Sequence, residues 1–139
     1  MLALALGAYA SDRADAQDPS GFRSPSGNIH CQYFKAAAGD PPGSSTLRCD
    51  LAATSNPQPR RPRDCPLEYG HAFEMLERGG SPGRICHGDT AIDASLPVLA
   101  YGSVWTRGGF TCRSEPSGVN CTNSDGRGFA LARAVQRLF

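Results

Sequence analysis

Six cysteines constrain the fold of this chain more than any other feature of its sequence. They are Cys31, Cys49, Cys65, Cys86, Cys112 and Cys121, and no two of them form a C-x-x-C pair. Zinc sites built from cysteine usually need such closely spaced pairs, whereas an even number of widely spaced cysteines is typical of disulfides in exported proteins. We therefore expect three disulfides, no metal site and no cofactor, although the spacing alone leaves the pairing open.

Two related segments suggest where four of these cysteines lie. "FRSPSGNIHC" ends at Cys31, and "CRSEPSGVNC" runs from Cys112 to Cys121. In both, Pro-Ser-Gly has the chemistry of a tight turn, because proline presets one turn position and glycine accepts a positive φ. Apolar and polar residues alternate around each turn, which predicts β-hairpins.

The phase of the cysteines within these strands suggests their pairing. Each of the four is in phase with the apolar residues of its strand, where an inter-strand disulfide would face a core. A two-residue loop places Cys112 opposite Cys121, whereas a three-residue loop would shift the register by one. The resulting prediction is Cys31–Cys49, Cys112–Cys121 and, by elimination, Cys65–Cys86.

The rest of the chain also favours short strands and turns, since it holds 16 Gly and 11 Pro. Residues 52–64 form a polar, Pro-rich connector. "LPVLAYGSVW" (residues 96–105) predicts a strand, and "FALARAVQRLF" (residues 129–139) predicts a strand followed by a short C-terminal helix. The predicted fold is mainly β: a small disulfide-stabilised antiparallel sheet or partly closed barrel built of hairpins, with roughly seven or eight short strands.

The N-terminus indicates export. "MLALALGAYA" resembles the apolar stretch of a signal peptide, with cleavage candidates after Ala10 and Ala16, and no segment reaches the length of a membrane span. We therefore expect a signal peptide in residues 1–16, a single domain in residues 17–139 and a periplasmic or extracellular location. The 14 basic and 13 acidic residues nearly balance, so the composition gives no reason to expect nucleic-acid binding.

Two segments contain side chains that can carry catalytic chemistry. Cys86 and His87 suggest a thiol nucleophile beside a base, but neighbours on a strand point in different directions and Cys86 is needed for the third disulfide. Glu68, His71 and Glu74 would share one face of a helix, where they could act in acid–base catalysis or hold a metal. A solvated surface explains them equally well, and we favour a strand pair turning at "RGGSPG" over a helix in this segment.

Three further groups are candidates for binding. Tyr101, Trp105 and Arg107 would form a binding patch if exposed, because aromatic and Arg residues anchor many interfaces. A sole tryptophan in a small β domain is nevertheless more often part of the core. The basic run Arg60, Arg61 and Arg63 is typical of a solvated loop, with an acidic partner as the alternative. Asn123 and Asp125 favour a turn over a calcium loop.

Five motifs together resemble a known family. They are "FRSPSGNIHCQ", "LRCDL", "YGSVW", "GGFTCRSEPSGVNCTN" and "GRGFALAR", which extend from about Phe22 to Leu131. In combination they are similar to a family of small exported bacterial proteins, domain of unknown function 6636. The resemblance implies an exported, cysteine-rich domain and assigns no activity, cofactor or catalytic residue.

These observations favour a non-catalytic binding module of the bacterial envelope over an enzyme. Its partner would be an envelope component, either a protein or a small ligand. The alternative is a small exported hydrolase or thiol enzyme that uses His71 with Glu68 or Glu74, or Cys86 with His87. No Ser-His-Asp signature, phosphate-binding glycine loop or H-E-x-x-H motif is present in the sequence.

Overall fold

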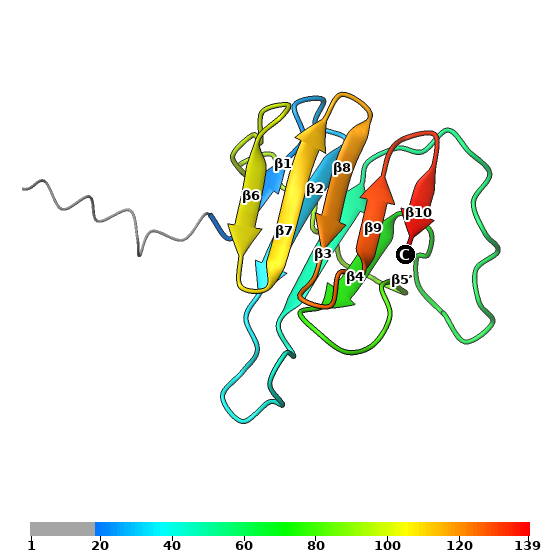
Figure 1. Ribbon diagram of the computed structural model, residues 1–139. Coiled ribbons are helices and arrows are strands. Elements are labelled where there is room, and N and C mark those ends of the chain that lie inside the picture. The colour runs from blue at the N-terminus through cyan, green and yellow to red at the C-terminus, as the bar shows by residue number, and fades with distance from the viewer. Residues whose placement is uncertain (1–18) are drawn as a thin grey trace, which may run out of the picture.

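The computed structural model describes residues 19–139, so the predicted signal peptide at residues 1–16 lies outside the described part. The described chain forms two five-stranded antiparallel sheets that lie face to face (Figure 1). The first sheet contains β1 (Gly21–Arg23), β2 (Ile29–Phe34), β3 (Thr46–Leu51), β4 (Ala72–Leu76) and β5 (Gly83–Arg84). The second contains β6 (Val104–Arg107), β7 (Phe110–Glu115), β8 (Gly118–Thr122), β9 (Gly128–Leu131) and β10 (Gln136–Leu138). In both sheets, strands that follow one another in sequence are also hydrogen-bonded neighbours.

The repeated Pro-Ser-Gly segments form the same structural device, one in each sheet. The first turn joins β1 to β2 and places Phe22 opposite Cys31, and the second joins β7 to β8 and places Cys112 opposite Cys121. Phe22 therefore occupies the position in the first sheet that Cys112 occupies in the second. Cys31 bonds instead to the strand on its other side, at Cys49 of β3.

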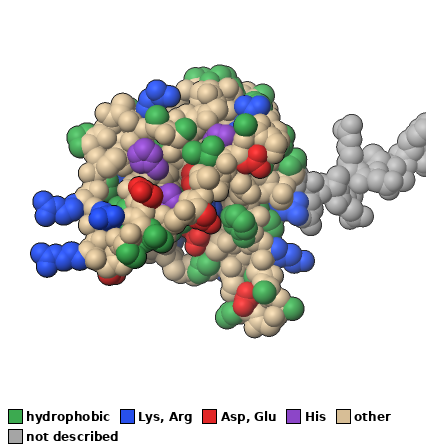
Figure 2. Space-filling model, turned by 180° about the vertical axis from the view of Figure 1, so that it is seen from behind, with side chains coloured by type: hydrophobic (Ala, Val, Ile, Leu, Met, Phe, Trp, Pro, Cys, Tyr) green, Lys and Arg blue, Asp and Glu red, His purple; other side chains and the backbone are tan. Residues whose placement is uncertain are grey.

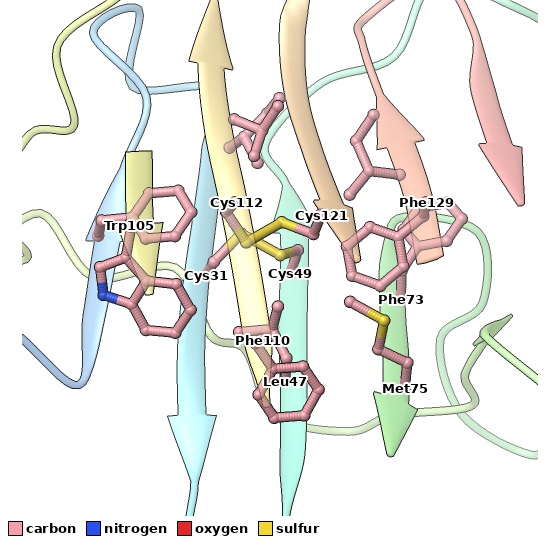
Figure 3. Close-up of a cluster of buried hydrophobic side chains, with 14 of the residues drawn as sticks. Cys31, Leu47, Cys49, Phe73, Met75, Trp105, Phe110, Cys112, Cys121 and Phe129 are labelled. Atoms are coloured by element: carbon pink, nitrogen blue, oxygen red, sulfur yellow. A yellow bond between two sulfur atoms is a disulfide. The ribbon is translucent and has the colours of Figure 1, made fainter. Parts of the chain in front are cut away.

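All three predicted disulfides are confirmed: Cys31–Cys49, Cys65–Cys86 and Cys112–Cys121. The first and third join directly opposed residues of adjacent strands, with α-carbons 4.1 Å apart, and point into the space between the sheets (Figure 3). There the two disulfides meet, because the sulfur atoms of Cys31, Cys49 and Cys121 lie within 4.8 Å of one another. This grouping of sulfur atoms is thus a pair of stacked disulfides in the centre of the core.

Aromatic pairs extend this core on both sides of the disulfides. Phe22 of β1 packs against Trp105 of β6 with ring centroids 5.3 Å apart, and Phe73 of β4 packs against Phe129 of β9 at 6.2 Å. These four side chains are at most 2% exposed. Because each pair joins one sheet to the other, burial of apolar surface holds the two sheets together.

The structure corrects three predictions of topology. The sheets remain separate, so the fold is a two-layer sandwich and not a partly closed barrel. Residues 136–138 pair with β9 as β10, and the predicted C-terminal helix is absent. An isolated helix of this length is marginal, whereas the pairing satisfies backbone groups. The predicted strand at residues 96–105 is restricted to its end, where β6 begins at Val104. The strand pair favoured for residues 72–84 is confirmed as β4 and β5.

An irregular segment, residues 88–99, crosses the outer face of the first sheet and is called the strap. Side chains that alternate with the core residues of β1, β2 and β3 hold it in place. Gln32 donates to the carbonyl of Ala91, and Arg23 donates to that of Leu96. His30, which faces away from the core as its position beside Cys31 predicts, accepts at Nδ1 from the amide of Asp93. The outward polar residues of this sheet thus serve to anchor the strap.

Candidate functional site

A partly buried ionic network centred on Arg48 of β3 anchors the start of the strap. Arg48 bonds to Asp50 through Nε at 2.9 Å and to the carboxylate of Asp89 through Nη1 at 2.7 Å. Asp50 also accepts from the amide of Ala91 and the hydroxyl of Thr90. Burial alone would lower the pKa of Arg48, but its hydrogen bonds to the two aspartates outweigh this effect and raise it. The guanidinium of Arg48 is therefore charged at every ordinary pH, and its bonds to the two aspartates serve a structural purpose.

Asp89 makes the attachment of the strap dependent on pH. Its hydrogen bond with Arg48 lowers the pKa of Asp89 from the ordinary value of 3.8. A carboxyl whose pKa is lower in the folded state stabilises the fold above its unfolded pKa, and this contribution is lost as the pH falls through the folded pKa. We expect Asp89→Asn to destabilise the protein at neutral pH and to match the wild type well below pH 3.8. Urea unfolding between pH 2 and pH 7 measures this difference.

The control for this experiment is Asp64→Asn, which removes an exposed carboxylate that lies outside the strap. Its unfolding midpoint should follow that of the wild type at every pH. A difference between Asp89→Asn and wild type that persists unchanged to the lowest pH would contradict the proposed role of the Asp89 carboxylate.

A shallow groove beside the strap collects several side chains singled out in the sequence. This histidine groove is lined by Asp50, Glu68, Tyr69, His71, His87 and Thr90, among others. The backbones of Glu68 and His87 are paired by two hydrogen bonds of 3.0 Å, which places the two residues side by side. Figure 2, which shows the molecule from the side of the first sheet, displays histidine and acidic side chains close together on this face.

The polar groups of the histidine groove are largely engaged in holding the structure together. His71 lies 3.2 Å from the hydroxyl of Thr54 through Nε2, and Nδ1 of His87 lies 2.6 Å from the carbonyl of Asp89. Within residues 19–139, neither of these histidines forms a hydrogen bond with a carboxylate. The groove thus lacks the oriented base–carboxylate pair that most acid–base mechanisms need.

Glu74 and Cys86 do not join Glu68, His71 and His87 in this groove. Glu68, His71 and Glu74 share no helical face, since the segment is extended and Glu74 lies within β4, outside the groove. Cys86 is bonded to Cys65, and the chain has no free cysteine. This bond overturns the thiol-enzyme alternative, because a nucleophile needs a free thiolate.

The structure separates the three residues of the predicted binding patch. Trp105 is 2% exposed and donates through Nε1 to the carbonyl of Pro19, so it belongs to the core. Tyr101 is 51% exposed, in the turn before β6. Arg107 lies over the ring of Tyr33, with its guanidinium carbon 5.2 Å from the ring centre. Of these three residues only Tyr101 is a largely exposed aromatic side chain, and a binding role for the three residues stays a prediction.

Tyr101 borders a cleft at one end of the sandwich. The two Pro-Ser-Gly turns, between β1 and β2 and between β7 and β8, lie at this end (Figure 1). This end cleft has a volume of about 190 Å³. Ser24, Ser26 and Asn28 line it from the first turn. Glu115, Ser117 and Arg133 line it from the second sheet.

The lining residues of the end cleft fall into two classes. Ser24, Ser26 and Asn28 are used internally, since the two hydroxyls bond to each other and the Asn28 side chain bonds to the backbone of Ala53. In contrast, the side chains of Tyr101, Glu115 and Arg133 form no hydrogen bond or ion pair anywhere in residues 19–139. An acid, a base and an aromatic ring are therefore available to a ligand in one cleft.

Sequence reasoning found Tyr101 but missed Glu115 and Arg133. The repeated Pro-Ser-Gly turn was the one available signal, because two equivalent turns in stacked sheets can meet at the same end. Asn123 and Asp125 form a turn as predicted, in which the Asn123 side chain accepts from the amides of Asp125 and Arg127.

Comparison with known proteins identifies the family. No curated protein and no solved structure matches the chain. Within the described residues, no helix is long and apolar enough to cross a membrane. The model of the Family of unknown function (DUF6636) matches residues 1–139, the whole chain, in agreement with the resemblance of the motifs. The chain therefore belongs to this family, a two-sheet, disulfide-stabilised member of it.

Proposed function

We propose that this domain is a non-catalytic binding module of an exported bacterial protein, periplasmic or extracellular, and that the end cleft holds a ligand from the envelope. The observation that carries the proposal is the presence of unpaired Tyr101, Glu115 and Arg133 around one cleft. Three disulfides are typical of proteins in oxidising compartments, which supports export.

The chemistry of the cleft indicates the kind of ligand that fits. Arg133 can bind a carboxylate or phosphate, Glu115 can accept hydrogen bonds from hydroxyl or amino groups, and Tyr101 can pack against an apolar face. The volume of about 190 Å³ is smaller than that of most drug-sized sites. A ligand the size of an amino acid or a monosaccharide, or the end of a longer molecule, suits these dimensions.

Titration of the ¹⁵N-labelled domain with amino acids, dipeptides and monosaccharides tests the proposal. We expect at least one class to shift the amide signals of the non-proline residues in 24–28 and 115–118. Tyr101→Ala should weaken that binding at least tenfold. Tyr69→Ala is the matched control, since it removes the same side chain from the histidine groove. Binding lost in Tyr69→Ala but kept in Tyr101→Ala would contradict the proposed site.

The second candidate is a hydrolase that uses the histidine groove. Its support is the collection of His71, Glu68 and Asp50 in one groove. Hydrolysis of a panel of esters and glycosides by the wild type, abolished in His71→Ala but retained in Tyr101→Ala, would favour this function over the binding module. The binding module predicts no turnover of these substrates.

A further inference from the structure

The loop of residues 52–64, here called the arginine loop, extends from one side of the sandwich between β3 and β4 (Figure 1). Arg60, Arg61 and Arg63 are all exposed. Figure 2 shows basic side chains projecting from this side of the molecule. This surface is separate from the ligand cleft of the proposed function.

The arginine loop is held at both ends although it contains no strand. At its start, the backbone amide of Ser55 donates to the backbone carbonyl of Arg133 at 2.8 Å. The side-chain amide of Asn56 donates to the side-chain oxygen of Gln136 at 3.1 Å. At its end, the disulfide of Cys65 ties it to Cys86. Pro57, Pro59 and Pro62 fix φ at three positions between these anchors. The loop therefore presents its arginines with little conformational entropy left to lose on binding.

With three arginines and one acid, Asp64, the loop carries a net positive charge. Both ion pairs found in residues 19–139 belong to Arg48, so Arg60, Arg61 and Arg63 have no acidic partner there. Arg61 donates to the carbonyl of Leu67, which orients its guanidinium without cancelling its charge. A local positive field thus exists on a chain whose net charge is only +1.

The composition of the loop discriminates among anionic partners. Residues 52–64, "AATSNPQPRRPRD", include no aromatic side chain on which a base could stack and no large apolar side chain to form the core of a protein interface. What remains is a row of exposed guanidinium groups, which matches repeating anions along a hydrophilic polymer. We propose that the arginine loop binds acidic polysaccharides.

Binding to polygalacturonate, a carboxylate polymer, and to dextran sulfate tests the inference on the intact domain. We expect binding at low salt that weakens steeply as salt is added, because each arginine contact releases counterions. The triple variant Arg60→Ala/Arg61→Ala/Arg63→Ala should bind at least tenfold more weakly and show a shallower salt dependence. The matched control Arg78→Ala/Arg113→Ala/Arg127→Ala removes the same charge from exposed positions elsewhere and should stay within about twofold of the wild type.

Three outcomes would overturn the inference. One is no binding of the wild type to either polymer at low salt. Another is an equal loss of polymer affinity in the two triple variants, which would reveal a general effect of net charge. The third is tighter binding to single-stranded DNA of matched charge, which would make the loop a nucleic-acid surface. Tyr101→Ala should leave polysaccharide binding unchanged, so failure of this inference is distinguishable from failure of the proposed ligand cleft.

Discussion

Replacing Cys112 and Cys121 together with alanine is expected to lower the free energy of unfolding by about 3–5 kcal/mol. Closure of this short loop in the unfolded chain accounts for about 3 kcal/mol in the chain-entropy model. The remainder arises because the lost sulfur atoms pack against the Cys31–Cys49 disulfide, and their removal leaves a void in a core that is completely buried. Guanidinium unfolding followed by circular dichroism measures the change.

The disulfide of Cys65 and Cys86 provides the control, because it separates the effect of loop length from that of packing. Its sequence separation is 21 residues, compared with 9 for Cys112–Cys121, so chain entropy alone predicts the larger loss on its removal. Cys86 is exposed and no stacked disulfide lies beside it. We therefore expect the Cys65→Ala/Cys86→Ala variant to be the more stable of the two. If the Cys65→Ala/Cys86→Ala variant is instead the less stable of the two, the packing argument is contradicted.

The pairing of the core cysteines could be predicted because it depends on short-range pattern. Cys112 and Cys121 flank a single turn, and the period-two alternation of apolar residues specifies which face each side chain occupies. The same reasoning placed His30 away from the core. Trp105 was proposed for a binding patch, and its burial agrees instead with the general frequency of buried tryptophans in small β domains.

The strap could not be predicted, because its residues have no periodicity. In "LRCDL", Arg48 and Asp50 alternate with core residues and have the pattern of solvent-facing positions, yet both are buried beneath residues 88–99. For the C-terminal segment, the helical spacing of Ala132, Val135 and either Leu138 or Phe139 was misleading. Val135 is 58% exposed, so this spacing does not mark a buried face.

The grouping of residues around the end cleft could not be predicted from the sequence for a different reason. Its free polar side chains are Glu115 at the end of β7 and Arg133 just after β9, whereas Tyr101 lies before the start of β6. No local motif joins these residues, because the side-by-side pairing of β6, β7, β8 and β9 within the second sheet brings the strand ends together. The repeated turn indicated a repeated structure but not which side chains would surround it.

Arg48→Ala is expected to be the most damaging single substitution outside the apolar core, with a loss of about 3–5 kcal/mol in the free energy of unfolding. Asp50, which is 2% exposed, would keep its hydrogen bonds from Thr90 and the amide of Ala91 but lose the guanidinium that balances its charge. The cost of an unpaired buried carboxylate greatly exceeds that of a lost hydrogen bond. Urea unfolding at pH 7 measures this loss.

Two comparisons identify the unpaired charge as the cause. Arg23→Ala also removes an arginine that holds the strap, but its Nε donates to the carbonyl of Leu96, so only about 1 kcal/mol should be lost. The double variant Arg48→Met/Asp50→Leu removes both charges and should be more stable than Arg48→Ala, because apolar side chains of similar size need no compensating charge. If Arg48→Ala costs no more than Arg23→Ala, the strap is held by its hydrogen bonds alone. The buried charges of β3 would then contribute nothing beyond those bonds.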